Sequence, residues 1–411
     1  MSINISEIKI ENKGQWDSYV KSHPMGNIYQ LSGWKAVIEN TYGHKTYYLL
    51  ATQGNKNEST TINQLSKPAS KSGAYDDAGE HFLDSTGSND LSARSQYRNS
   101  NGILGILPIV HIKNILFGNN LISMPFCDMG GVLADNDTIK RELVLEALKI
   151  GKKLSTNNIE LRNIETLKCL ISINGNCNAE GDNLLAKKWA VQTPPCKVRM
   201  VLELPESSDE LMKSFKSKLR SQIKKPIKEG LDTRIGQTEL LDDFYHVFAV
   251  NMKDLGSPVH SKRLFHNILK EFSENCKIAM TYIGKRPVAG GVMLFFKNTL
   301  MNPWASFLKS YKLLSPNMFL YWSMLAYASD NGFKYFDFGR CTPGGGTYKF
   351  KEQWGANPEI LDYSYFSING SFDGRPISEK KIFKIGSEVW KKLPVFSTKI
   401  GGPLFRKYIG L

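Results

Sequence analysis

The stretch SPNMFLYWSMLAYASDNGFKYFDFGR (residues 315–340) gives an apolar helix, a polar Asp-Asn-Gly turn and a strand in succession. Three strand-like runs precede it, namely KIAMTYIG, PVAGGVMLFFKNT and LMNPWASF. The same order occurs earlier, where KTYYLLAT, GILGILPIVHIK and NLISMPF lead into a helical stretch at 137–156 and the strand NIELRN. Leucines recur at helical spacing in that stretch, as in Leu143 and Leu154. The repeated unit predicts an α/β protein with mixed sheets, built from two related domains.

The boundaries of the two domains follow from composition. Pro194 and Pro195 break the pattern, so we expect a first domain at 1–193, a second at 194–370 and a basic, apolar tail at 371–411. Residues 52–102 are rich in Ser, Asn, Gly, Asp and Gln and have few apolar side chains. Such a segment buries too little surface to offset its ordering entropy, so it is predicted to be a disordered insertion in the first domain.

Charge and hydropathy limit the class of protein. The 411 residues carry a formal net charge of +14, which fits an anionic partner such as tRNA, a nucleotide-linked sugar or an acidic membrane, or no dedicated partner. Apolar runs are far shorter than the roughly 20 residues of a membrane span. Because the N-terminus also lacks an apolar signal core, we expect a cytoplasmic protein without a transmembrane segment.

Cysteine and histidine patterns do not indicate a metal centre. The cysteines are scattered, without a C-x-x-C pair, and no H-E-x-x-H is present. The sequence therefore predicts no zinc site and no disulfide framework. The six cysteines are Cys127, Cys169, Cys177, Cys196, Cys276 and Cys341.

The segment SSDELMKSFKSKLRSQIKKPIKEG (residues 207–230) predicts one strongly basic helix. Ser208 is the expected N-cap and Gly230 the C-cap, while Pro226 should kink or end the last turn. An apolar stripe steps along it by four: Leu211, Phe215, Leu219 and Ile223. Seven basic residues occupy the other faces: Lys213, Lys216, Lys218, Arg220, Lys224, Lys225 and Lys228. This basic face is either simply solvated or a platform for phosphates.

The stretch GGGTYKFKEQWG (residues 344–355) resembles a phosphate loop but fits neither familiar pattern. The chain has no G-x-x-x-x-G-K-[ST], and a G-x-G-x-x-G beginning at Gly344 fails at Lys349. We interpret the glycines as a flexible turn that brings Tyr348, Lys349, Phe350 and Lys351 together.

Four segments in the same order give a more specific indication: YQLSGWKAVIENTYGHKTYYLLA, LFGNNLISMPFCDMGGVLA, FKSKLRSQIKKPIKEG and YFDFGRCTPGGGTYKFKEQWG. In these segments the chain resembles the FemAB-like branch of the GNAT superfamily, most of all the proteins associated with exosortase/PEP-CTERM gene clusters. The resemblance implies two tandem GNAT-like domains. It also implies an acyltransferase, similar to peptidoglycan bridge aminoacyltransferases, that forms an amide on an amine of a cell-envelope glycan, exopolysaccharide or peptidoglycan precursor.

The resemblance also implies site residues. Fem enzymes place a Phe-Lys pair beside the acyl-donor site, which corresponds here to Phe350 and Lys351. A lysine in a partly dry cleft stabilises developing negative charge far better than one in water. Tyr348 is a further candidate for substrate contact. The alternative is that Phe350 and Trp354 are an i,i+4 core pair at a helix start.

Two aspartates are candidate catalytic residues. Asp337 and Arg340 end the strand of DFGR, where side chains of α/β folds often face the ligand. Asp337 could orient the lysine or accept a proton, and Arg340 could bind phosphate, or the two could form a structural pair. Asp128, before Gly-Gly, matches a Fem aspartate near the acceptor but is equally a common turn residue.

Three more residues are candidates for contact with the acceptor. Lys35 in SGWK falls where the family places a lysine near the acceptor's phosphates, whereas Trp34 beside it reads as a core residue. Lys253 and His260 could line the acceptor channel or simply belong to a connection between helices.

The donor is indicated by an absence. GNAT enzymes that use acetyl-CoA carry Q/R-x-x-G-x-G/A before the helix that starts near residue 315, but YKLLSPNMFLYW (residues 311–322) has no glycine. This counts against standard CoA binding and towards an aminoacyl-tRNA donor, with acyl-CoA still open and no tightly bound cofactor expected. Two alternatives to this amide-forming acyltransferase stay open. One is an acyl-CoA-dependent N-acyltransferase that acts on an amino sugar, and the other is a non-catalytic glycan- or nucleic-acid-binding protein.

The C-terminal segment EVWKKLPVFSTKIGGPLFRKYIGL (residues 388–411) mixes basic and large apolar residues. It could rest on an anionic surface at the inner face of the membrane, near a nucleotide- or lipid-linked acceptor, or pack on its own domain. Pro394 and the Gly-Gly-Pro at 401–403 are expected to prevent a long amphipathic helix.

Overall fold

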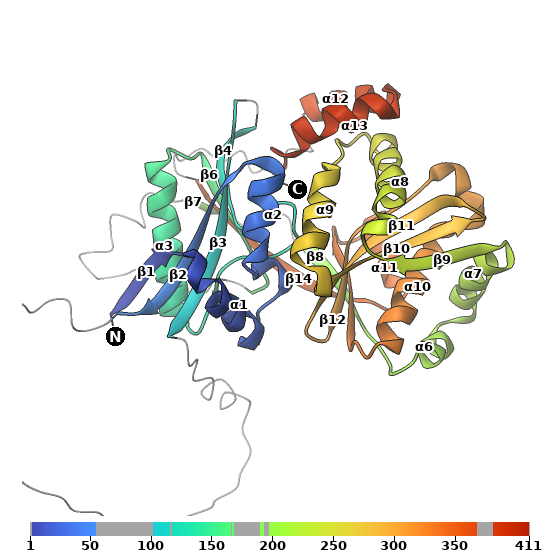
Figure 1. Ribbon diagram of the computed structural model, residues 1–411, viewed down its shortest axis with the longest axis horizontal. Helices are drawn as coiled ribbons and strands as arrows, with labels where there is room; N and C mark the ends of the chain where they lie inside the picture. The colour runs from blue at the N-terminus through green and yellow to red at the C-terminus, as the bar shows by residue number, and fades with distance from the viewer. Residues whose placement is uncertain are drawn as a thin grey trace, which may run out of the picture.

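The computed structural model describes residues 2–54, 102–115, 117–165, 167, 190–192, 197–367 and 381–410. Most of the predicted insertion at 52–102 lies outside the described residues, as does the expected junction at residues 193 and 194. The chain forms two lobes that lie side by side (Figure 1).

Among the described residues, the first lobe contains seven strands and three α-helices. In chain order its elements are β1 (Ile3–Glu7), α1 (Lys13–Ser22), α2 (Gly33–Tyr42), β2 (Lys45–Gln53), β3 (Ile103–Asn114), β4 (Gly118–Ile122), β5 (Leu133–Ala134), α3 (Asp137–Lys153), β6 (Asn158–Asn163) and β7 (Ala190–Gln192).

The second lobe repeats the arrangement of the first. Its elements are β8 (Lys197–Glu203), α6 (Ser208–Ser214), α7 (Ser217–Lys228), β9 (Leu231–Gly236), α8 (Leu241–Asp254), α9 (Lys262–Glu271), β10 (Cys276–Ile283), β11 (Arg286–Phe296), β12 (Thr299–Phe307), α10 (Pro316–Asp330), β13 (Tyr335–Cys341) and α11 (Gly346–Glu352). Three elements follow α11 in the chain: β14 (Asn357–Ser367), α12 (Lys381–Lys392) and α13 (Val395–Arg406).

The same topology occurs in both lobes, which confirms the predicted α/β class and the duplication. In the first lobe β2, β3 and β4 are antiparallel neighbours, and α3 leads to β6, which runs parallel to β4. In the second lobe β10, β11 and β12 are antiparallel neighbours, and α10 leads to β13, which runs parallel to β12. The predicted strand NIELRN coincides with β6.

Strand β14 joins the lobes into one sheet. Its first half pairs with β8 of the second lobe and its second half pairs with β6 of the first lobe. The largest apolar core also crosses the boundary between the lobes. The ring centroids of Trp34 on α2 and Phe272 at the end of α9 are 5.2 Å apart. The two lobes therefore form one packed unit, and residues at their boundary are held in fixed positions.

The predicted basic helix is two helices, α6 and α7. Phe215 between them has an extended backbone, which directs its ring into the core against Trp354. The N-cap is Ser207, not Ser208, because the Ser207 hydroxyl accepts the N–H of Glu210 at 3.3 Å. Pro226 does not end α7, which runs on to Lys228. The apolar stripe is buried as predicted, with all four of its residues in the core of the second lobe.

The C-terminal segment folds into two helices that cover the second lobe beside α8 (Figure 1). Pro394 precedes α13 as its N-cap, but the Gly-Gly-Pro at 401–403 lies within α13 and does not interrupt it. Gly402 is needed there because a Cβ atom would lie 2.8 Å from Val259. Among the residues that the structure describes, no helix has the length and apolarity to cross a membrane.

Candidate active site

Strands β12 and β13 separate at the position of the site. They are paired in parallel only between Thr299–Met301 and Tyr335–Asp337. Two residues further on, Gly339 has φ +77°, a conformation that glycine adopts at little cost. The register of β13 against β8 also shifts between Asp337 and Arg340. The end of β13 is thus released from β12, and it meets the first lobe there.

Lys351 lies under this end of β13. It belongs to the short helix α11, which begins after the turn in which Gly344 has φ +74°. Its side chain is only 3% exposed, and Nζ donates to the carbonyl oxygens of Gly339 at 2.7 Å and Arg340 at 3.0 Å. Burial lowers the pKa of Lys351, and the nearby Cys341 and carboxylates oppose the shift.

Asp337 is buried, and its carboxylate has partners within the second lobe. Its Oδ1 accepts the N–H of Gly339 at 2.8 Å, and its Oδ2 lies 3.3 Å from a guanidinium nitrogen of Arg199. Burial raises the pKa of Asp337, while Arg199 and the Gly339 amide act in the opposite direction. Both carboxylate oxygens are engaged, so Asp337 fixes the shape of the turn at Gly339.

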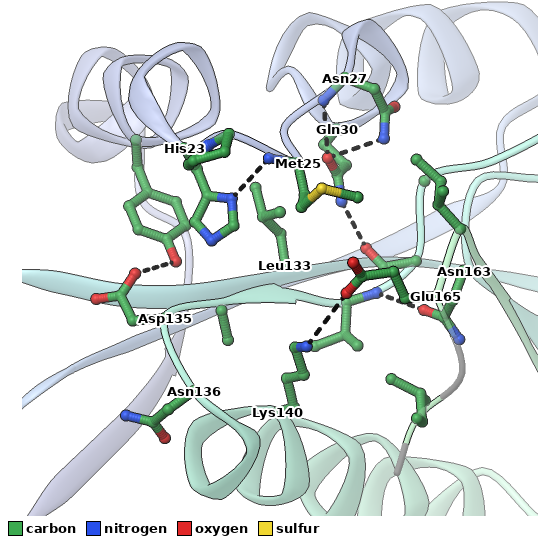
Figure 2. Close-up of a pocket in the computed structure, with 18 of the residues that line it drawn as sticks. His23, Met25, Asn27, Gln30, Leu133, Asp135, Asn136, Lys140, Asn163 and Glu165 are labelled. Atoms are coloured by element: carbon green, nitrogen blue, oxygen red, sulfur yellow. Dashed lines mark hydrogen bonds and ion pairs between the residues drawn. The ribbon is translucent and has the colours of Figure 1, made fainter. Parts of the chain in front are cut away.

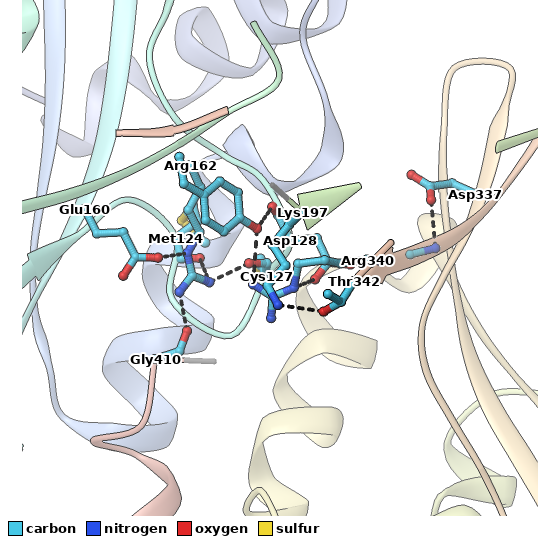
Figure 3. Close-up of polar contacts among 12 residues, drawn as sticks. Met124, Cys127, Asp128, Glu160, Arg162, Lys197, Asp337, Arg340, Thr342 and Gly410 are labelled. Carbon is cyan, nitrogen blue, oxygen red and sulfur yellow. Dashed lines mark hydrogen bonds and ion pairs between the residues drawn. The ribbon is translucent and has the colours of Figure 1, made fainter. Parts of the chain in front are cut away.

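Asp128 comes from the first lobe and meets Arg340 of the second (Figure 3). Its Oδ2 accepts the backbone N–H of Arg340 at 2.9 Å, and its Oδ1 lies 3.4 Å from the Arg340 Nε. The Tyr363 hydroxyl donates to the Asp128 carbonyl at 2.5 Å. The Asp128 side chain is 18% exposed, against 2% for Asp337. Asp128 is therefore the more accessible of the two carboxylates.

Arg162 holds the loop that carries Asp128. Its side chain is buried, with Nε 2.7 Å from Glu160 and a terminal nitrogen 2.6 Å from the Cys127 carbonyl. It also donates to the carbonyl of Gly410, so the C-terminus is tied to the same loop (Figure 3). Arg162, Arg199 and Tyr363 were not predicted from the sequence. NIELRN indicates a strand but not the partners of its arginine.

The aromatic neighbours of Lys351 belong to the core of the second lobe. The Phe350 ring packs edge-on against Tyr321 at 5.0 Å and also contacts Trp354 at 6.3 Å. Tyr348 is half-buried against the same apolar cluster. Lys351 thus reaches the lobe boundary while the aromatic side chains of α11 anchor the helix.

His260 lies in a buried aromatic cluster between the lobes. Its Nδ1 is 2.7 Å from the Tyr42 hydroxyl and its Nε2 is 3.0 Å from the Arg406 Nε. Arginine can only donate, so Nε2 accepts and Nδ1 carries the proton towards Tyr42. Burial, reinforced by Arg406, lowers the pKa of His260 well below 6.5.

Replacing His260 by Gln should make the fold less sensitive to acid. Glutamine can accept from Arg406 and donate to Tyr42 but takes up no proton. In the native protein His260 stays neutral, whereas in the unfolded chain it is protonated below about pH 6.5, so the free energy of unfolding falls there by up to about 1.4 kcal/mol per pH unit. Urea unfolding at about pH 7.5 and about pH 5.5 measures this difference. Equal acid sensitivity in both proteins would argue against a neutral His260.

Lys35 and Lys253 form their contacts away from the cluster of Lys351, Asp337, Asp128 and Arg340. The Nζ of Lys35 lies 2.5 Å from a Glu39 carboxylate oxygen and 2.7 Å from the Thr46 hydroxyl. The Nζ of Lys253 lies 3.4 Å from Asp254 on α8. The structure thus brings Lys351, Asp337, Asp128 and Arg340 together and places Lys35, Lys253 and His260 elsewhere. Trp34 is a core residue as predicted.

Two cavities lie near the cluster. A cavity of about 740 Å³ in the second lobe is lined by α6, α7 and residues 352–355, which follow Lys351 directly. A cavity of about 430 Å³ in the first lobe lies between α1, α3 and the end of β6 (Figure 2). Gly130 and Arg162 are among its lining residues. Its wall includes His23, whose pKa burial lowers to about 4.

The described part of the chain holds no group of three or more His, Cys, Asp or Glu side chains arranged to bind a metal ion. Cys127, Cys276 and Cys341 are buried and free.

Comparison with known proteins identifies the fold. Residues 213–352 match the acetyltransferase (GNAT) domain family. The structure of FemX is similar over 87% of this chain and 96% of its own, with 14% identity and a TM-score of 0.56. A tandem GNAT protein from the clavulanic acid biosynthesis pathway covers 90% of this chain and 100% of its own, at 8% identity and a TM-score of 0.49.

A third structure, L-PGS from Bacillus licheniformis, covers 72% of this chain and 88% of its own, at 11% identity and a TM-score of 0.43. No curated protein matches the chain in sequence. Residues 213–352 thus match an acetyltransferase (GNAT) domain, and the two-lobe fold is similar to that of FemX, which agrees with the acyltransferase expected from the sequence.

Proposed function

We propose that this acyltransferase transfers an aminoacyl or acyl group to an amine of a cell-envelope glycan, exopolysaccharide or peptidoglycan precursor. One observation carries the proposal, the buried ammonium of Lys351 at the boundary of the lobes. An ammonium has three N–H donors, and two of those of Lys351 bind carbonyls of β13. The third is engaged by no residue that the structure describes, and we propose that it donates to the oxyanion of the bound substrate.

The chemistry follows from these groups. The acceptor amine attacks the acyl carbonyl, a C–N bond forms, and the carbonyl oxygen becomes an oxyanion that the Lys351 ammonium stabilises. The intermediate collapses with cleavage of the C–O bond of an aminoacyl ester or the C–S bond of a thioester. Asp128 takes the proton from the amine and passes it to the leaving oxygen or sulfur, so the products are an amide and a free alcohol or thiol.

The four clustered residues take different roles in this scheme. Asp128 is the base because its carboxylate is the more exposed. Asp337 is a positioning residue that shapes the turn over Lys351. Arg340, whose side chain is 19% exposed beside Asp128, is placed to bind a phosphate of the substrate.

We propose aminoacyl-tRNA as the donor, and the charge on α7 supports it. None of the seven basic residues at 213–228 forms an ion pair with a described residue, and α7 contains no acid. The Nζ of Lys225 reaches the carbonyl of Leu313 just before α10, so α7 adjoins the helix start where GNAT enzymes bind the donor. An unpaired basic surface of this kind favours a polyanion. Acyl-CoA is the alternative donor, which the GNAT domain match favours.

A transfer assay tests the function. Label is supplied either as a mixed pool of aminoacyl-tRNA or as acyl-CoA, with a nucleotide-linked amino-sugar precursor of the envelope as acceptor. We expect label in an amide product with the tRNA pool, abolished by ribonuclease. Transfer from acyl-CoA alone would replace the proposed donor, and no transfer from either would contradict the proposed function.

Neutralising α7 should weaken donor binding without slowing the chemical step. Lys224→Gln with Lys228→Gln removes two exposed charges, so KM for aminoacyl-tRNA should rise about three- to tenfold at low salt while kcat stays unchanged. The slope of log KM against log salt should also flatten. The control is Lys152→Gln with Lys153→Gln, two exposed lysines of α3. An equal change in both variants would point to net charge and not to α7.

A further inference from the structure

The helices α12 and α13 carry a concentration of exposed large apolar side chains. Phe396, Ile400 and Leu404 are 73%, 58% and 61% exposed, and they recur every four residues along α13. Ile385 and Val389 on α12 are separated by the same interval, and Phe405 adds a sixth side chain. Isolated exposed leucines are normal, but a stripe on two adjacent helices marks an interaction site.

The stripe on α13 faces away from the body of the protein. Thr398 and Gly402 are buried, and Gly402 packs against Val259 of the second lobe. Residues two positions apart on a helix point about 200° from each other, so Ile400 lies on the outer face.

The same relation holds on α12. Its Ser387 packs against Gly256 of the second lobe, which turns Ile385 and Val389 outwards. Both helices lie together at one end of the molecule (Figure 1).

The charges around the stripe are mainly positive. Residues 385–410 contain four lysines, Lys391, Lys392, Lys399 and Lys407, and one acidic side chain, Glu388, while Arg406 packs against His260. Glu388 pairs with Lys391 at 2.6 Å, and Lys392 is exposed. An apolar stripe beside an excess of lysines over acids complements a surface that is both apolar and anionic.

We propose that α12 and α13 dock the protein on an anionic lipid surface. The apolar side chains enter the boundary between head groups and acyl chains, and the lysines contact lipid phosphates. Each helix has 12 residues, too few to cross a bilayer, so both lie on the surface. The docked segment is close to the active site, because the Gly410 carbonyl binds Arg162 beside the Asp128 loop. The proposal does not depend on the identity of donor or acceptor.

Co-sedimentation of the full chain with vesicles tests this surface. We expect binding to vesicles of phosphatidylcholine mixed with phosphatidylglycerol, little binding to phosphatidylcholine alone, and release by salt. The variant Phe396→Ser, Ile400→Ser, Leu404→Ser should bind at least about tenfold more weakly.

A matched control replaces three exposed apolar residues elsewhere, Ile10→Ser, Ile115→Ser and Leu313→Ser, and should bind as the parent does. Thermal melting of both variants should match the parent, since none of these side chains is in the core.

Absence of binding to the anionic vesicles would overturn the proposal, as would equal binding by the stripe variant. A parent protein that is dimeric by light scattering, becomes monomeric in the stripe variant and binds no vesicles would assign the stripe to a second copy of the chain instead.

Discussion

Replacing Lys351 by Met should lower kcat by about 10²- to 10³-fold, the cost of removing one oxyanion donor. Methionine has nearly the length of lysine and no charge, so it fills the same space without the N–H donors. The carbonyls of Gly339 and Arg340 lose their partner, and some loss of stability is expected as well. Steady-state kinetics with the donor from the transfer assay, alongside a thermal melt, separates the two effects.

Lys349 supplies the matched control, because it lies on the same short helix and is exposed. Lys349→Met should leave kcat within about twofold of the parent.

The parent itself should lose activity at high pH, since only the protonated lysine stabilises an oxyanion. Burial lowers the pKa of Lys351, so this loss begins below the ordinary lysine value of 10.5. Unchanged kcat in folded Lys351→Met would remove Lys351 from the mechanism.

Replacing Asp128 by Asn should lower kcat by about 10²- to 10⁴-fold, the range for loss of a general base. The amide oxygen of Asn can still accept the N–H of Arg340, so the loop should keep its position. KM for the donor should change little, because the acceptor amine is the group that Asp128 deprotonates.

Asp337→Asn distinguishes a base from a positioning residue. Asp337 is buried against Arg199 and Gly339, so its replacement should lower the melting temperature, with a smaller loss of kcat than in Asp128→Asn. The reverse ranking, with the larger loss of kcat in Asp337→Asn, would exchange the two roles.

The fold could be anticipated from the sequence because its signals are local. Strand and helix periodicity repeats in the same order in both halves, and β6 was placed within its bounds. The four clustered residues were candidates for a related reason, since Asp337 and Arg340 lie in a strand that leads into the glycine turn, Lys351 follows that turn and Asp128 precedes Gly130. The break at Phe215 was missed because the stripe from Leu211 to Ile223 continues through it. Only its packing against Trp354 shows that the helix is interrupted there.

Contacts between distant residues were beyond the sequence. Arg162 binds Gly410 near the other end of the chain, and His260 is tied to Arg406. No spacing rule connects such pairs. From the sequence His260 could line the acceptor channel or belong to a connection between helices, whereas its partners make it part of the buried boundary between the lobes. The proposed roles of Asp128 as a base and of Asp337 as a positioning residue likewise depend on the burial of the two side chains, which the sequence does not report.

The central claim is that Lys351 of one lobe and Asp128 of the other serve the same transition state. The most direct measurement is kcat of Lys351→Met, Asp128→Asn and the protein with both changes. Groups that act as a unit are strongly non-additive, so we expect the double variant to be no slower than about threefold below the slower single variant. A double variant whose loss equals the product of the two single losses would contradict the claim, because the two side chains would then act independently.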